Sequence, residues 1–164
     1  MKRAGWVLAA GLLAGCATEG GGVLVFDINP IGANDEAFVA ARGTGQPVVV
    51  LGGDPEATAA QLRLPQRLGG GGFAAAAPGT TASRLVFSFA PLGPRAMCQG
   101  GQAGPGAGSG EASVAWCIQS RTLAYARGRG AALASPDAPG FGQAARRMTN
   151  AMLAPVRSRR GDNR

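Results

Sequence analysis

The chain has 164 residues, which suits one small domain, and it carries a formal net charge of +7. It contains no histidine, and its only lysine is Lys2, so it lacks the bases that activate the nucleophile of serine hydrolases. Aromatic residues make up only 5% of the chain and form no pattern suited to stacking with bases. Despite the positive charge, we therefore expect no nucleic-acid partner.

The first 15 residues have the parts of a secretory signal peptide. Lys2 and Arg3 precede an apolar run at residues 4–14, which is shorter than the roughly 20 residues that span a bilayer. The run leads into Leu13-Ala14-Gly15-Cys16, which resembles the lipobox of bacterial lipoproteins. The alternative is an ordinary signal peptide, with Cys16 as a free or paired thiol.

The lipobox resemblance implies that the chain is cleaved before Cys16 and lipidated there. Lipid on the sulfur and a fatty acyl chain on the new amine would anchor the protein stably, because a single acyl chain binds membranes only marginally. The next residue is Ala17 rather than the aspartate that favours the inner membrane. We therefore expect attachment to the outer membrane, with residues 16–22 as a lipidated tether and the domain facing the periplasm.

Lipidation of Cys16 would leave two cysteines, Cys98 and Cys117. In an oxidising compartment their expected state is a disulfide, which would close a loop of roughly 20 residues and stabilise the fold by about 3 kcal/mol. Two reduced thiols are the alternative. A redox-active pair is less favoured because the two cysteines lack C-x-x-C spacing. Two cysteines without histidine do not make a usual tetrahedral metal site, so we expect no metal or other cofactor.

Strand and helix signals alternate in the first half of the domain. Apolar residues at 23–26 indicate a short strand, and the Asn-Asp-Glu sequence at 34–36 indicates a helix start. The run PVVVL at 47–51 is typical of a buried strand. The Asp-Pro-Glu sequence at 54–56 predicts a second, capped helix, which Pro65 ends or kinks.

Strand signals dominate the second half. A weak strand is expected at 73–77 and a clear one at 83–89, where apolar side chains alternate with the period of two. The alternating runs at 114–119 and 122–126 predict two neighbouring strands joined by a turn. The glycine-rich sequence at 99–110 is expected to be a mobile loop.

The last predicted element is a helix that begins near Asp137. Its apolar side chains recur at helical spacing and should dock on the sheet. They are Phe141, Ala145, Met148 and Met152. The element order predicts a single α+β domain over residues 23–155, a two-layer sandwich with a mostly antiparallel sheet and helices packed on one face. The arginine-rich residues 156–164 are expected to form a disordered basic tail.

Two pairs of acidic residues are the candidates for catalytic carboxylates, Asp35 with Glu36 and Asp54 with Glu56. Paired carboxylates can hydrolyse glycosidic bonds. Both pairs fall at predicted helix starts, where the helix dipole favours acidic residues. A structural role is therefore the stronger interpretation of both pairs.

The predicted layout is similar to that of small lipoproteins of GC-rich proteobacteria. The shared features are a cysteine after an apolar strand and loop, a second cysteine in the next strand and a closing amphipathic helix. This resemblance implies no particular activity. We expect a non-enzymatic, lipid-anchored envelope protein with an accessory or structural role, which binds a protein partner or the cell wall. Two alternatives stay open: a periplasmic module that binds a lipid or small apolar ligand under the last helix, and a carboxylate-based hydrolase.

Overall fold

The computed structural model describes residues 22–32, 35, 39, 45–80, 82–102 and 107–154. The predictions for the signal peptide at 1–15, for Cys16 and for the tail at 156–164 therefore lie outside the described residues. The same holds for Asn34 and Glu36 and for the centre of the glycine-rich loop, at 103–106.

Six strands and three helices make up the regular structure of the described residues. The strands are β1 (Leu24–Asn29), β2 (Gln46–Leu51), β3 (Phe73–Ala75), β4 (Arg84–Ser88), β5 (Glu111–Ile118) and β6 (Arg121–Arg129). The helices are α2 (Pro55–Gln61), α3 (Pro94–Cys98) and α4 (Phe141–Met152). Short 3₁₀ segments lie at Gln66–Leu68 and Ala131–Leu133. All the strands that the sequence predicts are present, most of them with slightly different ends.

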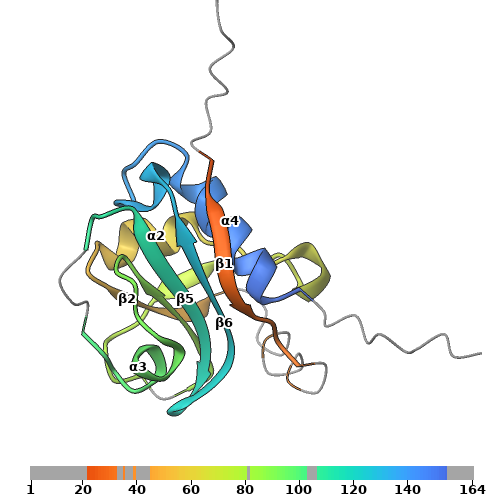
Figure 1. The fold of residues 1–164 in the computed structure, drawn as a ribbon. Helices are drawn as coiled ribbons and strands as arrows, with labels where there is room; N and C mark the ends of the chain where they lie inside the picture. Colours follow the sequence, from red (N-terminus) through yellow and green to blue (C-terminus); the bar gives the residue numbers. More distant parts are fainter. Residues whose placement is uncertain are drawn as a thin grey trace, which may run out of the picture.

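The strands form one sheet in the order β1-β6-β5-β4-β2-β3 (Figure 1). The pairs β1–β6, β6–β5 and β5–β4 are antiparallel, whereas β2 runs parallel to both β4 and β3. Parallel strands need a crossover rather than a hairpin, and the segment that contains α2 supplies it between β2 and β3. The prediction of an α+β fold with a mostly antiparallel sheet is confirmed.

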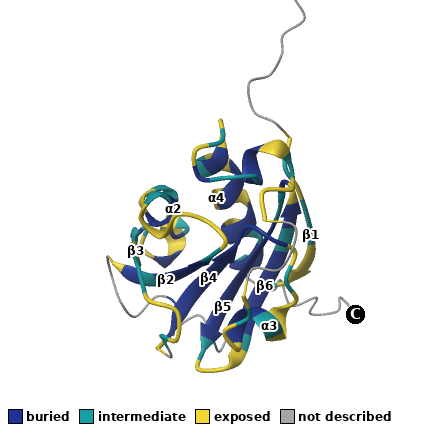
Figure 2. Ribbon diagram, turned by 90° about the vertical axis from the view of Figure 1, so that its left-hand side faces the viewer, coloured by how far each residue is buried: buried dark blue, intermediate teal, exposed yellow. Residues whose placement is uncertain are grey.

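Helices α2 and α4 cover one face of the sheet, which we call the helix face (Figure 2). Because side chains alternate along a strand, every second residue of β2, β4 and β5 points into the core on this side. The buried strand residues of this core include Val48, Val50, Leu85, Phe87, Val114 and Trp116. The apolar stripe predicted for the last helix is buried against them, which confirms that the helix docks on the sheet.

The start of α4 differs from the prediction. The helix begins at Phe141 rather than near Asp137. The residue before it, Gly140, has φ of 81°, a left-handed conformation that does not occur within a right-handed α-helix. Pro139 stands immediately before this glycine. The chain at 135–140 forms turns instead, and the helix starts only beyond them.

Helix α2 starts as the sequence predicts but ends earlier than predicted. The Asp54 side chain accepts a hydrogen bond from the backbone N–H of Ala57 at 2.8 Å, and Pro55 takes the first helical position. The helix ends at Gln61, because Leu62 is already extended, so the predicted stop at Pro65 is wrong. Only the start of the helix therefore follows from the local sequence.

Helix α3 was not predicted, and it does not share the helix face. It packs on the opposite side of the sheet, where its residues Met97 and Cys98 are buried beside Val86 and Tyr125 (Figure 2). We call this side the α3 face. The expectation that helices pack on one face thus holds for α2 and α4 but not for α3. This short helix covers part of the opposite face.

Candidate functional site

A pocket of about 520 Å³ opens on the α3 face. It is lined by Val49, Leu51, Pro78, Gly79, Thr80, Arg84, Val86, Met97, Cys98, Gln99, Gly100, Gln119 and Ser120. These residues come from strands β2 and β4, from α3 and from three connecting segments. We call it the Arg84 pocket, after the only charged residue among the described residues of its lining.

Neighbouring strands supply the apolar floor of the pocket. Val49 of β2 lies opposite Val86 of β4 in the parallel register, and Leu51 follows two residues later on the same face. Met97 of α3 adds a buried side chain. Strand β2 is apolar on both faces, because Val48 and Val50 enter the core on one side while Val49 enters the pocket floor on the other. This explains the unbroken run PVVVL.

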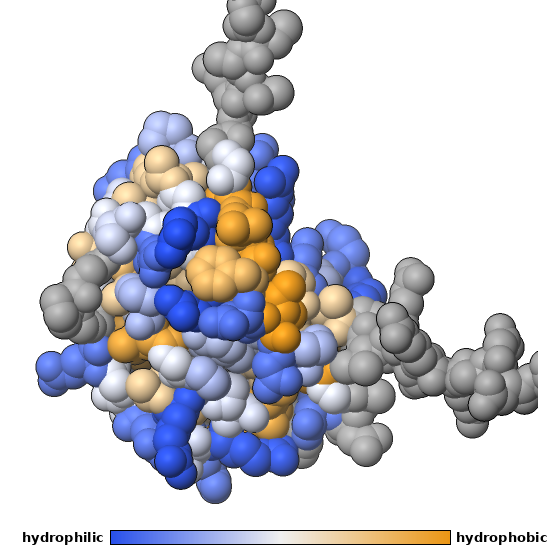
Figure 3. Space-filling model, in the orientation of Figure 1, coloured by the Kyte–Doolittle hydropathy of each residue, from blue (hydrophilic) through white to orange (hydrophobic). Residues whose placement is uncertain are grey.

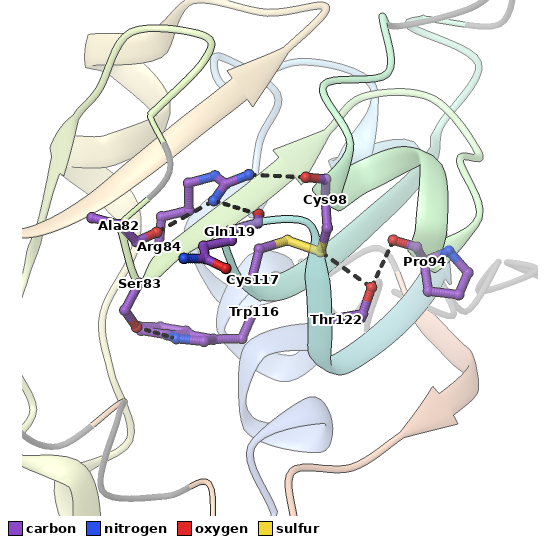
Figure 4. Close-up of a disulfide and its surroundings, with 9 residues drawn as sticks. All are labelled: Ala82, Ser83, Arg84, Pro94, Cys98, Trp116, Cys117, Gln119 and Thr122. Carbon is purple, nitrogen blue, oxygen red and sulfur yellow. Dashed lines mark hydrogen bonds between the residues drawn. A yellow bond between two sulfur atoms is a disulfide. The ribbon is translucent and has the colours of Figure 1, made fainter.

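A disulfide fastens α3 to the sheet at one wall of the pocket. It joins Cys98, the last residue of α3, to Cys117 of β5, with 5.5 Å between their Cα atoms. The Thr122 hydroxyl donates to the Pro94 carbonyl at 2.9 Å, and its Oγ1 lies 3.2 Å from Cys98 Sγ (Figure 4). The two ends of α3 are therefore both held to the β5–β6 hairpin.

The segment before α3 is also held to the sheet. The Tyr125 hydroxyl donates to the Leu92 carbonyl at 2.6 Å, and the Leu92 backbone N–H donates to Ser113 Oγ at 3.0 Å. Burial raises the pKa of the Tyr125 phenol above its ordinary value. The phenol therefore stays protonated as a donor over the whole neutral range.

Arg84 is the only charged residue among the buried side chains that the structure describes, and it is 6% exposed. Its Nη1 donates to the carbonyls of Ala82 at 3.3 Å and Gln119 at 3.0 Å, and its Nη2 donates to the Cys98 carbonyl at 3.0 Å (Figure 4). Burial lowers the pKa of the guanidinium, but an arginine stays charged in proteins at neutral pH.

The charge of Arg84 is balanced by carbonyl dipoles alone within the described part of the chain. No described carboxylate forms an ion pair with it, whereas Arg121, Arg127 and Arg129 each pair with an acidic side chain. Its three hydrogen bonds to described residues use three of the five N–H donors of a guanidinium. The pocket lining thus combines an apolar floor with one incompletely bonded cation.

The structure does not bring the candidate catalytic carboxylates together. Asp35 pairs with Arg121 at 3.2 Å, beside the turn between β5 and β6. Asp54 caps α2 just after β2 ends. The strand registers align Leu51, the last residue of β2, with the end of the β5–β6 hairpin that lies away from its turn. Glu56 is exposed in the first turn of α2. The described residues of the two pairs thus lie at opposite ends of the sheet, and Asp54 has the structural role expected for it.

The alternative of a module for a small apolar ligand requires a cavity under the last helix, and this space is filled with side chains. Phe141 packs against Phe87 and Phe89, with ring centroids 5.7 and 5.5 Å apart. Met148 and Met152 are fully buried in the same core. The apolar stripe of the last helix thus forms ordinary core, and the Arg84 pocket lies on the other side of the sheet. No group of three or more cysteines and acidic residues that could hold a metal ion occurs among the described residues.

Sequence reasoning missed Arg84 and the residues around it. The available signal was an arginine at the start of the clear strand at 83–89, on the face opposite Leu85 and Phe87. That face is often solvent-exposed in an antiparallel sheet, so an arginine there does not by itself indicate a binding site. Arg84 is buried because α3 and the β5–β6 turn pack beside it and accept its hydrogen bonds.

A second surface feature is the edge strand β1. Leu24 and Ile28 of β1 are 64% and 46% exposed. Figure 3 shows a hydrophobic strip along this strand. Phe26 lies under the guanidinium groups of Arg127 and Arg129, 5.3 and 6.0 Å from the ring centroid. In the described sheet β1 pairs only with β6, so its other edge carries unpaired backbone groups.

The chain has no match among protein families, curated proteins or solved structures. Within the described residues, every helix is too short or too polar to cross a membrane.

Proposed function

We propose that the protein is a lipid-anchored protein of the bacterial cell envelope whose domain binds a small ligand with an apolar body in the Arg84 pocket. The lipobox at 13–16 supports the anchor and the periplasmic location. The observation that carries the binding role is the pocket itself. It has the volume of known small-molecule sites, roughly 300 to 1,000 Å³, and their usual lining of apolar side chains with a few polar groups.

The surroundings of the pocket support a preformed site. Its floor belongs to interior strands of the sheet, and its α3 wall is held by the Cys98–Cys117 disulfide and by the hydrogen bond from Thr122. A wall that is already in place costs little conformational entropy when the ligand binds. The site can therefore bind a small molecule without a large rearrangement.

Binding without catalysis is the activity that the lining residues support. They include no carboxylate, histidine or free thiol, the groups that most often act as bases or nucleophiles. The guanidinium, amides and hydroxyls that are present can orient a ligand, but none of them is a general base at neutral pH.

Photoaffinity labelling of the full protein in lipid nanodiscs tests this role. We expect an uncharged alkyl diazirine to label peptides that contain β2, β4 or α3. The variant Leu51→Trp should reduce this labelling because it fills the pocket, whereas Asn150→Trp, on the exposed side of α4, should not. Labelling that is unaffected by Leu51→Trp, or that lies elsewhere on the domain, would contradict the proposal.

The exposed edge of β1 favours a second candidate function, the binding of a protein partner in the envelope. Within the described sheet this edge has no partner strand, and with Leu24 and Ile28 exposed it suits the addition of one. A photoreactive amino acid at position 28 should then crosslink one discrete partner in cells, and the same amino acid at position 150 should not. Equal crosslinking from the two positions would rule out a specific contact at β1.

A further inference from the structure

We infer that the ligand of the Arg84 pocket is an amphipathic anion whose carboxylate pairs with the Arg84 guanidinium. The inference rests on the proposed binding function and specifies the chemical class of the ligand. It starts from an imbalance of charge: Arg84, a residue that is 6% exposed, has no carboxylate partner among the described residues. A buried charge without a counter-charge is unfavourable, and an anion in the pocket would remove that cost.

The guanidinium is held in a fixed orientation. Its three carbonyl acceptors belong to segments far apart in the sequence: Ala82 before β4, Cys98 at the end of α3 and Gln119 in the β5–β6 turn. Nε–H is not among the donors that these carbonyls use. A planar donor that is oriented in advance and retains free N–H groups is well suited to bind a carboxylate.

The lining also limits the charge and shape of the anion. Arg84 is the only charged residue among the described lining residues, so these residues balance a single negative charge and leave a phosphate dianion undercompensated. Val49, Val86 and Met97 form an apolar floor beside the guanidinium. A carboxylate with a short alkyl body satisfies both the cation and the floor.

A different interpretation is that Arg84 only braces the three segments whose carbonyls it bonds. A brace would affect folding but would not discriminate between ligands by their charge. The decisive measurement therefore compares ligands of one shape and different charge on the wild-type protein. No variant has to fold for this comparison.

The test is competition with the alkyl diazirine label by octanoate, octan-1-ol and octylamine, with the full protein in nanodiscs of uncharged lipid. We expect octanoate to compete at a concentration at least about tenfold lower than octan-1-ol does, which corresponds to one charge-assisted pair, and octylamine to be the weakest. The advantage of octanoate should disappear as the pH falls through the pKa of its own carboxyl group, because Arg84 stays charged.

Two variants locate the effect. In Arg84→Met the advantage of octanoate over octan-1-ol should be lost, while Arg84→Lys, which keeps the charge, should retain part of it. The matched control is Arg147→Met, on the exposed side of α4, which should leave the preference unchanged.

The outcomes separate the two proposals. Equal competition by octanoate and octan-1-ol would overturn the anion inference and leave the proposed binding function intact. If neither compound competes and no label enters the pocket, the binding function fails as well. Retention of the octanoate preference in a folded Arg84→Met protein would show that another group recognises the anion.

Discussion

The two faces of the sheet differ in how completely they are covered. On the helix face, α2 and α4 bury a continuous core that includes Phe87, Trp116 and Phe141. On the α3 face, one helix of five residues and its flanking loops cover part of the sheet and leave a pocket of about 520 Å³. The same strands supply both faces, so the difference comes from the elements packed against them.

The comparison indicates a division of roles within single strands. Val86 and Phe87 are neighbours in β4, yet Phe87 contacts the α4 helix and Val86 lines the pocket. We therefore expect substitutions on the helix face to change stability alone. Substitutions on the α3 face should change ligand binding as well.

Phe87→Ala should lower the free energy of unfolding by about 3 to 5 kcal/mol, because it opens a cavity between β4 and α4. Urea denaturation followed by circular dichroism measures this loss. Photolabelling of the folded fraction should remain at the wild-type level. Loss of labelling in protein that is still folded would show that the two faces are not independent.

Replacement of both cysteines, Cys98→Ser with Cys117→Ser, should lower the free energy of unfolding by about 3 kcal/mol, since it removes the link that closes the loop between them. Labelling of the pocket should fall as well, because α3 is then held only by hydrogen bonds and packing. Denaturation curves and label yield are measured on the same protein. An unchanged label yield would mean that the disulfide serves stability alone.

Val86→Ala should lower the free energy of unfolding by only about 1.5 kcal/mol, the value for removing two buried methylene-sized groups. It should nevertheless change the competition by octanoate, since it reshapes the pocket floor beside Arg84. The control is Phe87→Ala at the neighbouring position, which should lose more stability than Val86→Ala but keep the ligand binding of the wild-type protein. The reverse pattern would contradict the division between the faces.

Tyr125→Phe should lower the free energy of unfolding by about 1 kcal/mol at neutral pH, through loss of the hydrogen bond to Leu92. Burial raises the pKa of Tyr125 above 10.0, so the phenol ionises at lower pH in the unfolded chain than in the folded one. The wild-type protein should therefore lose stability as the pH rises past about 10. Denaturation measured across this range should show a weaker pH dependence for Tyr125→Phe, and parallel curves would contradict the assignment.

Local signals in the sequence predicted most of the helix face. Asp54 and Pro55 set the start of α2, and the spacing of Phe141, Ala145, Met148 and Met152 identified the buried face of α4. The alternation of Leu85 and Phe87 identified the strand face that contacts α4. These predictions succeed because each depends on neighbours within a few positions along the chain.

The candidate site could not be predicted in the same way. Helix α3 is five residues long and has no side-chain cap, and Pro94 at its start is its only local signal. The pairing of Cys98 with Cys117 was expected from the cysteine count, and these two residues form the disulfide in the structure. That pairing did not reveal that α3 would lie on the face opposite α4.

The sequence by itself determined the strands, the capped helix α2, the buried face of α4 and the residues available for a disulfide. Only the tertiary structure decided that Arg84 is buried, because two of its three acceptors, Cys98 and Gln119, come from segments distant in sequence that pack over it. The physical reason is that periodicity and capping act within one element, whereas burial of a charge depends on which elements the fold brings over it.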